Sequence, residues 1–304
     1  MKPRALKPGD TVGLVTPASP LGLEKIAFLI QLLEEEGYRV QLGAHAFDRD
    51  DYLAGSDEAR AADLMWAFTD PTIDAVICNR GGYGAARLFP YLDLDVMAAS
   101  GKIFAGFSDI TTLHLALLRR GLPVLHAPMG ITLVRERARW VYDSLRRALC
   151  GEDPIPAEAT KGTCLVPGIA EGSVTGGCLC LICDSLGTPD SIDCHGKIVI
   201  IEDVDENPHR VDAMLTHLIN AGQIQHAAGI VIGEMSGTDE RLDEGIGAKP
   251  WRTIVQDRLG GLGIPLIVDF PFGHAPQMLS LPLGIRALLD AEAGTLTYLE
   301  SLCA

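Results

Sequence analysis

A serine stands between a short apolar run and a helical pattern, where its hydroxyl could act as a nucleophile. Ser108 follows residues 102–105 and precedes a pattern that predicts a helix from 110 to about 120. A serine on a tight strand-to-helix turn projects its hydroxyl from the sheet edge, and the next backbone N–H groups face a developing oxyanion. Ser108 or Asp109 could equally be a helix N-cap, a position that both residue types favour. These residues alone do not decide between the two interpretations.

A catalytic serine also needs a base within hydrogen-bond reach and usually a carboxylate that orients the base. Two histidines stand at predicted strand or loop ends, and three carboxylates stand at predicted strand ends. They are His126 and His274, and Glu202, Asp203 and Glu234. Their positions along the chain do not show which histidine and which carboxylate would act with Ser108.

A glycine-rich segment follows another apolar run. Residues 80–84 read Arg-Gly-Gly-Tyr-Gly after the predicted strand 73–79. Glycines let a backbone approach a ligand closely and present its N–H groups. Neither Gly-Lys-Ser/Thr nor G-x-G-x-x-G spacing is present, so a Walker loop and a dinucleotide fingerprint are excluded. We expect an oxyanion or substrate-carboxylate loop in which Arg80, Gly81 and Tyr83 are candidate substrate contacts. A plain flexible turn is the alternative, and Arg80 could be structural.

The elements that must position these residues alternate between strand and helix. In the first half, strands are predicted near 11–16, 38–42, 73–79 and 123–129, and helices near 23–37, 56–69 and 140–149. This alternation is typical of a parallel sheet covered by helices. Further strands and helices are predicted beyond a stretch rich in Gly, Pro, Ala and Thr, which indicates a linker. We therefore expect domains at 1–150 and 169–304, joined by a linker at 151–168.

Composition excludes several functional classes. The 304 residues carry a net charge of −15, which argues against nucleic-acid or anionic-membrane partners. The basic N-terminus has no apolar core behind it, and no apolar run reaches the roughly 18 residues that span a bilayer. We expect a cytoplasmic protein. The eight cysteines include Cys178, Cys180 and Cys183, but paired C-x-x-C spacing is absent. We expect structural thiols, with a metal site or disulfides as weaker alternatives.

The chain resembles the LD-carboxypeptidases, serine peptidase family S66, over nearly its whole length. Each matching motif is modest, but the ordered set is specific. The motifs are Gly9-Asp10-x-Val12, Thr16-Pro17-Ala18-Ser19, Arg80-Gly81-Gly82-Tyr83-Gly84, Gly106-x-Ser108-Asp109, Gly176-Gly177, Ile201-Glu202-Asp203-x-x-Glu206 and Phe272-Gly273-His274.

The resemblance implies a catalytic triad in the order Ser, Glu, His. Ser108 matches the family nucleophile, His274 the general base and Glu202 the carboxylate that orients the histidine. Gly82 and Asp109 match the positions whose backbone N–H groups form the oxyanion hole. The implied fold is α/β: a flavodoxin-like N-terminal domain with a parallel sheet, and a C-terminal α/β domain that contains a small β-barrel.

The resemblance also implies an activity: hydrolysis of the amide between an L-centre and terminal D-Ala of muropeptide tetrapeptides in peptidoglycan recycling. The implied partner is a small peptide substrate, the implied assembly is a homodimer, and neither a cofactor nor a metal is expected. The microcin C self-immunity branch of the family instead cleaves peptidyl-nucleotide amides. The chain has Gly176-Gly177-Cys178-Leu179 where family members commonly have Gly-Gly-Asn-Leu, which bears on substrate contacts. A non-catalytic module that binds small anions is the alternative of another class. A cysteine amidotransferase is disfavoured because no cysteine stands at the serine turn.

Overall fold

The chain forms two compact units. The computed structural model describes residues 2–133, 137–243, 245 and 247–304. The first unit comprises Met1–Pro154, Ser280–Pro282 and Ser301–Ala304, and the second comprises Ile155–Leu279 and Leu283–Glu300.

The first unit is built on a six-stranded sheet of order β11-β5-β4-β3-β1-β2. Strands β1 to β5 pair parallel to their neighbours, with Val12 opposite both Val40 and Ala75. The order 2-1-3-4-5 is the flavodoxin-like arrangement, in which ligands bind beyond the carboxyl ends of the strands. The predicted flavodoxin-like fold with a parallel sheet is confirmed. The strands are β1 (Thr11–Val15), β2 (Arg39–Leu42), β3 (Ala75–Cys78), β4 (Ile103–Gly106), β5 (Val124–His126) and β11 (Leu281–Leu283).

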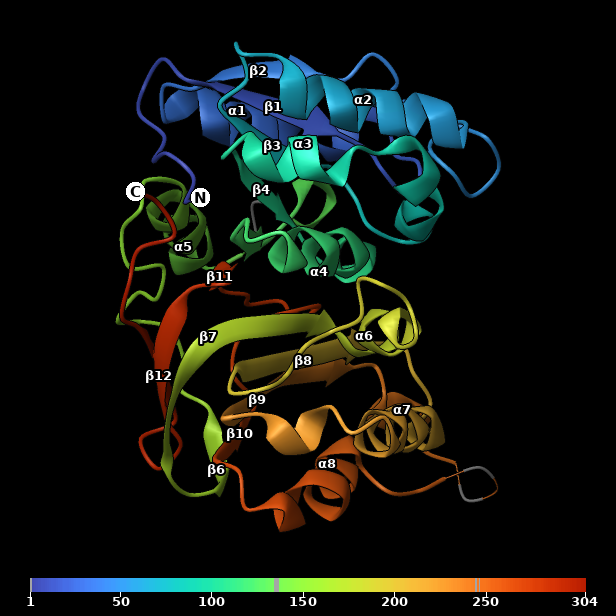
Figure 1. The fold of residues 1–304 in the computed structure, drawn as a ribbon, viewed down its shortest axis with the longest axis vertical. Coiled ribbons are helices and arrows are strands. Elements are labelled where there is room, and N and C mark those ends of the chain that lie inside the picture. Colours follow the sequence, from blue (N-terminus) through green and yellow to red (C-terminus); the bar gives the residue numbers. More distant parts are fainter. Residues whose placement is uncertain (1, 134–136, 244, 246) are drawn as a thin grey trace. The chain divides into compact units, whose positions relative to one another are not determined.

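Helices cover this sheet because its central strands are apolar on both faces. All residues of β1, β3 and β4 are buried, as expected of parallel strands between two helical layers. Figure 1 shows α2 and α3 side by side, and α2 packs on β1. The helices are α1 (Ala27–Glu35), α2 (Asp57–Thr69), α3 (Leu94–Ala99), α4 (Thr111–Arg119) and α5 (Arg139–Leu149), with 3-10 turns at Leu23–Lys25, Ala85–Tyr91, Ser108–Ile110 and Gly130–Thr132.

The second unit is built on a seven-stranded sheet of order β13-β12-β7-β8-β9-β10-β6. The four strands β7 to β10 run parallel, while β6, β12 and β13 pair antiparallel. Figure 1 shows β7 as a long curved strand. The strands are β6 (Thr163–Val166), β7 (Ile169–Cys178), β8 (Ile198–Val204), β9 (Gly229–Ser236), β10 (Leu266–Val268), β12 (Arg286–Asp290) and β13 (Thr295–Tyr298).

This sheet is curled into a half-barrel, which is how the predicted small β-barrel is realised. The backbone N–H of Gly162, just before β6, donates to the carbonyl of Gly294 in the turn between β12 and β13, at 2.9 Å. This bond links the two ends of the sheet order. Residues 163–166 lie inside the predicted linker but form edge strand β6. The helices are α6 (Leu179–Ser185), α7 (Pro208–Asn220) and α8 (Trp251–Leu259), with 3-10 turns at Ile224–His226, Asp239–Arg241 and Gly260–Leu262.

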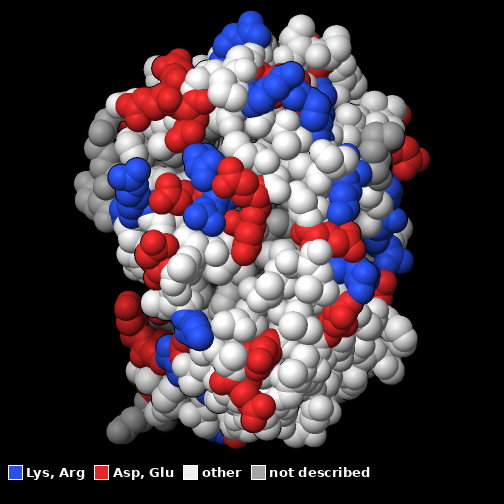
Figure 2. Space-filling view, turned by 90° about the vertical axis from the view of Figure 1, so that its left-hand side faces the viewer, with Lys and Arg blue, Asp and Glu red and all other residues white. Residues whose placement is uncertain are grey.

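The helices that the structure describes are short, the longest being the 13-residue α2 (Asp57–Thr69) and α7 (Pro208–Asn220). Over the part of the chain that the structure describes, every helix is too short or too polar to cross a bilayer. On the face drawn in Figure 2, acidic and basic side chains are interspersed, with broad uncharged areas between them.

Candidate active site

Ser108 stands on a strained turn directly after β4. Its φ is +61°, a left-handed conformation that residues other than glycine rarely adopt. The 3-10 turn Ser108–Ile110 leads into α4, whose N-cap is Ile110, so neither Ser108 nor Asp109 caps this helix. Ser108 is half-buried, while the residues before and after it are buried. A strained strand-turn-helix corner with a partly exposed serine is the geometry of a nucleophile elbow.

The glycine loop lies directly against this elbow. A Cβ added to Gly81 would lie 3.0 Å from Ser108 Cβ, 3.2 Å from its Oγ and 3.3 Å from the backbone N of Asp109. Only a glycine fits that approach without displacing the serine. The buried side chain of Asp109 ties the two segments together, since its Oδ2 accepts a 2.8 Å hydrogen bond from the backbone N–H of Ala85.

A second loop, at the end of β1, shapes the glycine segment from another side. The backbone N–H of Ser19 donates to the carbonyl of Gly81 at 3.1 Å, and its hydroxyl accepts from the N–H of Tyr83 at 3.2 Å. Gly82 has a φ of +102°, and a Cβ there would collide with Ser19 Oγ. Because both neighbours of Gly82 are bonded to Ser19, its backbone orientation is fixed before any ligand arrives.

Two predicted substrate contacts have different surroundings. The guanidinium of Arg80 is half-buried and donates to the carbonyl of Pro20 at 2.6 Å, which supports a structural role. Tyr83 is 54% exposed and pairs with Tyr52, which is 55% exposed, at a ring-centroid distance of 5.9 Å. Two neighbouring exposed aromatic rings offer an apolar surface to a ligand, so Tyr83 stays a candidate contact.

One buried arginine, in α2, belongs to none of the sequence motifs. Arg60 in α2 is 1% exposed, donates to the carbonyls of Pro17 and, at 3.0 Å, Gly84, and pairs with Asp57. Burial lowers the pKa of this guanidinium, and the Asp57 carboxylate opposes that effect. Arg60 thus joins the loop after β1 to the end of the glycine loop. The sequence signal that indicates its burial is an arginine on the same helix face as alanines and a leucine that are buried.

In the second unit, Glu202 is placed by an irregularity between two parallel strands. It lies in β8, opposite Cys178 of β7, and it is fully buried. The register between β8 and β9 shifts around it: Ile201 pairs with Ile232, but Asp203 pairs with Met235. Such bulges re-aim side chains and are common beside active sites.

Glu202 and His274 form a close pair. Glu202 Oε2 lies 2.7 Å from His274 Nδ1 and also accepts the backbone N–H of His274 at 3.2 Å. Gly273 makes this approach possible, since its φ is +88° and a Cβ there would lie 2.5 Å from Glu202 Cγ and Oε2. Burial lowers the pKa of His274, but the charge and hydrogen bond of Glu202, with Asp203 and Asp205, raise it above the ordinary value overall.

Asp203, the neighbour of Glu202, is also buried and is surrounded by donors. Its carboxylate accepts the backbone N–H groups of Cys180 at 2.9 Å and Val204 at 2.8 Å. The thiols of Cys178 and Cys180 face its Oδ1 at 3.4 and 3.8 Å. Burial, and next the charge of Glu202, raise the pKa of Asp203 to about 6. All eight cysteines of the chain are thiols, so the disulfide alternative is wrong.

The predicted residues thus gather in two groups. Ser108, Gly81, Gly82 and Asp109 meet in the first unit, whereas Glu202 and His274 meet in the second. Of the other candidates, His126 is fully buried at the end of β5, with its ring edge-on to Phe107 at 5.7 Å, and Glu234 is half-buried in β9.

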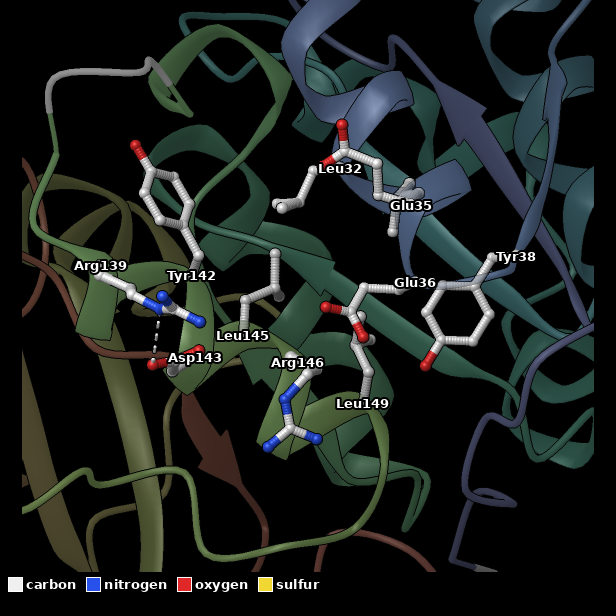
Figure 3. A pocket seen from close by; sticks show the side chains of 11 residues that line it. Leu32, Glu35, Glu36, Tyr38, Arg139, Tyr142, Asp143, Leu145, Arg146 and Leu149 are labelled. Atoms are coloured by element: carbon white, nitrogen blue, oxygen red, sulfur yellow. Dashed lines mark ion pairs between the residues drawn. The ribbon is translucent and has the colours of Figure 1, made fainter.

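A hollow of about 230 Å³ lies elsewhere in the first unit. Figure 3 shows that it lies between α1 and α5, with leucines at its base and Glu35, Glu36, Arg139 and Arg146 around it. None of the predicted site residues lines it. The hollow is therefore distinct from the Ser108 turn and the glycine loop.

Comparison with known proteins identifies the relatives of the chain. A family model described as "LD-carboxypeptidase N-terminal domain" matches residues 12–127, and one described as "LD-carboxypeptidase C-terminal domain" matches residues 171–289. The murein tetrapeptide carboxypeptidase of Pseudomonas aeruginosa is 33% identical over 92% of this chain and 93% of its own length.

Solved structures agree with this result. The muramoyltetrapeptide carboxypeptidase of Oxalobacter formigenes superposes with a TM-score of 0.84 and 28% identity, covering 95% of this chain and 97% of its own. The microcin C7 self-immunity protein, solved in complex with aspartyl sulfamoyl adenosine, gives a TM-score of 0.88 over the full length of both chains. At 23% identity that second likeness shows the fold alone.

Proposed function

The chain belongs to the LD-carboxypeptidase family, peptidase S66, and from this premise we propose that it is a serine LD-carboxypeptidase. The proposed reaction is hydrolysis of the amide between an L-centre, diaminopimelate or lysine, and the terminal D-Ala of muropeptide tetrapeptides. In this proposal the enzyme acts in peptidoglycan recycling in the cytoplasm, as a homodimer, on a small peptide substrate.

The proposed catalytic residues are Ser108, His274 and Glu202. Ser108 Oγ attacks the carbonyl carbon of the L-centre while His274 takes its proton through Nε2, since Nδ1 is bonded to Glu202. The backbone N–H groups of Gly82 and Asp109 stabilise the oxyanion. The tetrahedral intermediate collapses when His274 returns the proton to the leaving D-Ala amine, and water then hydrolyses the acyl-enzyme by the same steps in reverse.

The observation that carries the proposal is the conformation of Ser108. A residue other than glycine at φ +61° is held in that state by its surroundings, and the glycine loop packs directly against Ser108. Strain of about 1–3 kcal/mol at a single serine is typical of functional sites. The Glu202–His274 pair supports the proposal independently, since a buried carboxylate on Nδ1 orients an imidazole for proton transfer.

The test is release of D-Ala from L-Ala-γ-D-Glu-meso-diaminopimelate-D-Ala. We expect release by the unaltered protein, and loss of at least about 10³-fold in kcat for Ser108→Ala, because the nucleophile is removed. Ser100→Ala serves as the matched control, since this serine follows α3 in the same unit and its hydroxyl bonds only nearby backbone, donating to the carbonyl of Met97 and accepting from the N–H of Lys102. Full activity of Ser108→Ala would overturn the proposed nucleophile.

The same assay separates the candidate substrates. An aminoacyl sulfamoyl adenylate is included because the microcin branch of the family cleaves peptidyl-nucleotide amides. Cleavage of that compound without D-Ala release would move the assignment to the microcin-like activity. Absence of both activities, together with no labelling of Ser108 by a serine-directed phosphonate, would favour the non-catalytic anion-binding module.

A further inference from the structure

The thiols of Cys178 and Cys180 and the carboxylate of Asp203 lie close together beside Glu202. None of these three groups has a role in the proposed hydrolysis. Cys178 Sγ lies 3.4 Å from Cys180 Sγ and 3.4 Å from Asp203 Oδ1, and Cys180 Sγ lies 3.8 Å from the same oxygen. The three atoms thus form a nearly equilateral triangle. They come from the end of β7, the first turn of α6 and the end of β8, so the fold holds them together.

We propose that Cys178, Cys180 and Asp203 form a binding site for a thiophilic divalent cation, with zinc as the ion that the ligand set fits. Tetrahedral zinc with bonds of about 2.3 Å to sulfur and about 2.0–2.2 Å to oxygen separates two sulfurs by about 3.8 Å, and sulfur from oxygen by about 3.5–3.7 Å. The observed sulfur–sulfur and sulfur–oxygen distances differ from these values by a few tenths of an ångström. Thiolate ligands also exclude magnesium and calcium, which take oxygen donors.

The carboxylate of this cation site is already oriented. The backbone N–H of Cys180 holds Asp203 Oδ2 and the N–H of Val204 holds Oδ1, the kind of outer support that fixes a metal ligand. Cys178 and Asp203 are buried, whereas Cys180 is half-buried and gives an ion a route to the site. Binding replaces two S–H bonds by two metal–sulfur bonds and releases two protons to solvent, and water completes the tetrahedron.

The direct test is titration of the reduced, chelator-treated protein with cadmium, a spectroscopic substitute for zinc. We expect one tightly bound ion and a cadmium–thiolate charge-transfer band in the ultraviolet. The band distinguishes this site from imidazole binding, for example at His195 and His226, whose rings lie 5.2 Å apart. Cys180→Ala should abolish the band or weaken cadmium binding by at least about 100-fold.

Matched variants complete the test. Cys164→Ala removes a half-buried thiol of β6 outside the triangle and should leave the titration unchanged. Equal titrations of the unaltered protein and Cys180→Ala, or a protein without the band, would overturn the cation site. X-ray absorption of the zinc-loaded unaltered protein gives a second result that needs no variant: two sulfur ligands support the site, and none or four overturn it.

Discussion

Replacing Glu202 by glutamine tests the pair that should activate the nucleophile. Glutamine keeps the size of the buried side chain but removes its charge. Oε2 of Glu202 accepts from His274 twice, at 2.7 Å from Nδ1 and at 3.2 Å from the backbone N. An amide at this position offers its oxygen or its NH₂ group to Nδ1, and the second arrangement favours the wrong tautomer of the imidazole.

The magnitude follows from those bonds. A hydrogen bond to a charged group contributes about 1.5–3 kcal/mol, which corresponds to a loss of about 10- to 150-fold in kcat/KM when the imidazolium must be stabilised. The corresponding carboxylate-to-amide change in a serine protease triad lowers kcat by about 10⁴-fold, because the tautomer is inverted. We expect Glu202→Gln to fall between these limits, with little change in KM.

The pH profile provides a second readout that a merely structural role would not move. His274 acts as a base only when it is neutral, and its pKa is raised in the folded protein. The acid limb of kcat/KM should therefore lie above the ordinary histidine pKa of about 6.5. Burial lowers the pKa of His274, and the Glu202 charge opposes this effect. Glu202→Gln removes the charge, so the acid limb of kcat/KM should move to lower pH.

The measurement is D-Ala release from the tetrapeptide between pH 5 and 9, with folding checked by circular dichroism. Glu234→Gln is the matched control, since it removes another carboxylate of the same sheet. A folded Glu202→Gln protein with unchanged kcat and an unchanged acid limb would refute the role of this pair.

Three further changes test the packing of the site. Gly81→Ala places a Cβ 3.0 Å from that of Ser108, so kcat should fall at least about tenfold with little loss of thermal stability; unchanged kcat would contradict the contact. Gly273→Ala combines a φ of +88° with a 2.5 Å contact to Glu202, and urea unfolding should show a loss of about 2–4 kcal/mol; a loss below about 0.5 kcal/mol would be inconsistent with it. Arg60→Met leaves two buried carbonyls without their donor, and the free energy of unfolding should fall by about 2–5 kcal/mol in the same assay. An unchanged free energy of unfolding would contradict the structural role of Arg60.

Local patterns in the sequence were sufficient for the elements that carry the first half of the site. The β4–Ser108–α4 corner and the glycine loop are contiguous segments whose apolar runs, glycines and helical periodicity are visible directly. The periodicity of consecutive strands and helices likewise predicted the parallel sheet, because each βαβ unit is local in the chain. The pairing of Glu202 with His274 is not local, and the residues alone left His126, Asp203 and Glu234 open.

The features that the sequence did not reveal all depend on contacts between distant segments. Strand β11 joins the edge of the first sheet from late in the chain, and β6 forms inside the predicted linker because β10 pairs with it. Arg60 donates hydrogen bonds to backbone carbonyls of two different loops. Hydrophobic periodicity does not predict that these loops lie close together. The approach of Cys178 and Cys180 to Asp203 depends on the register of β7 against β8, which the sequence does not state.

Labelling with a serine-directed phosphonate tests the central claim most directly, because it reports the nucleophile without assuming a substrate. We expect one adduct per chain, located at Ser108 by mass spectrometry and formed at least about 10²-fold more slowly in His274→Ala, since the base is removed. An adduct on another serine, no adduct at all, or an unchanged rate in His274→Ala would contradict the proposed triad.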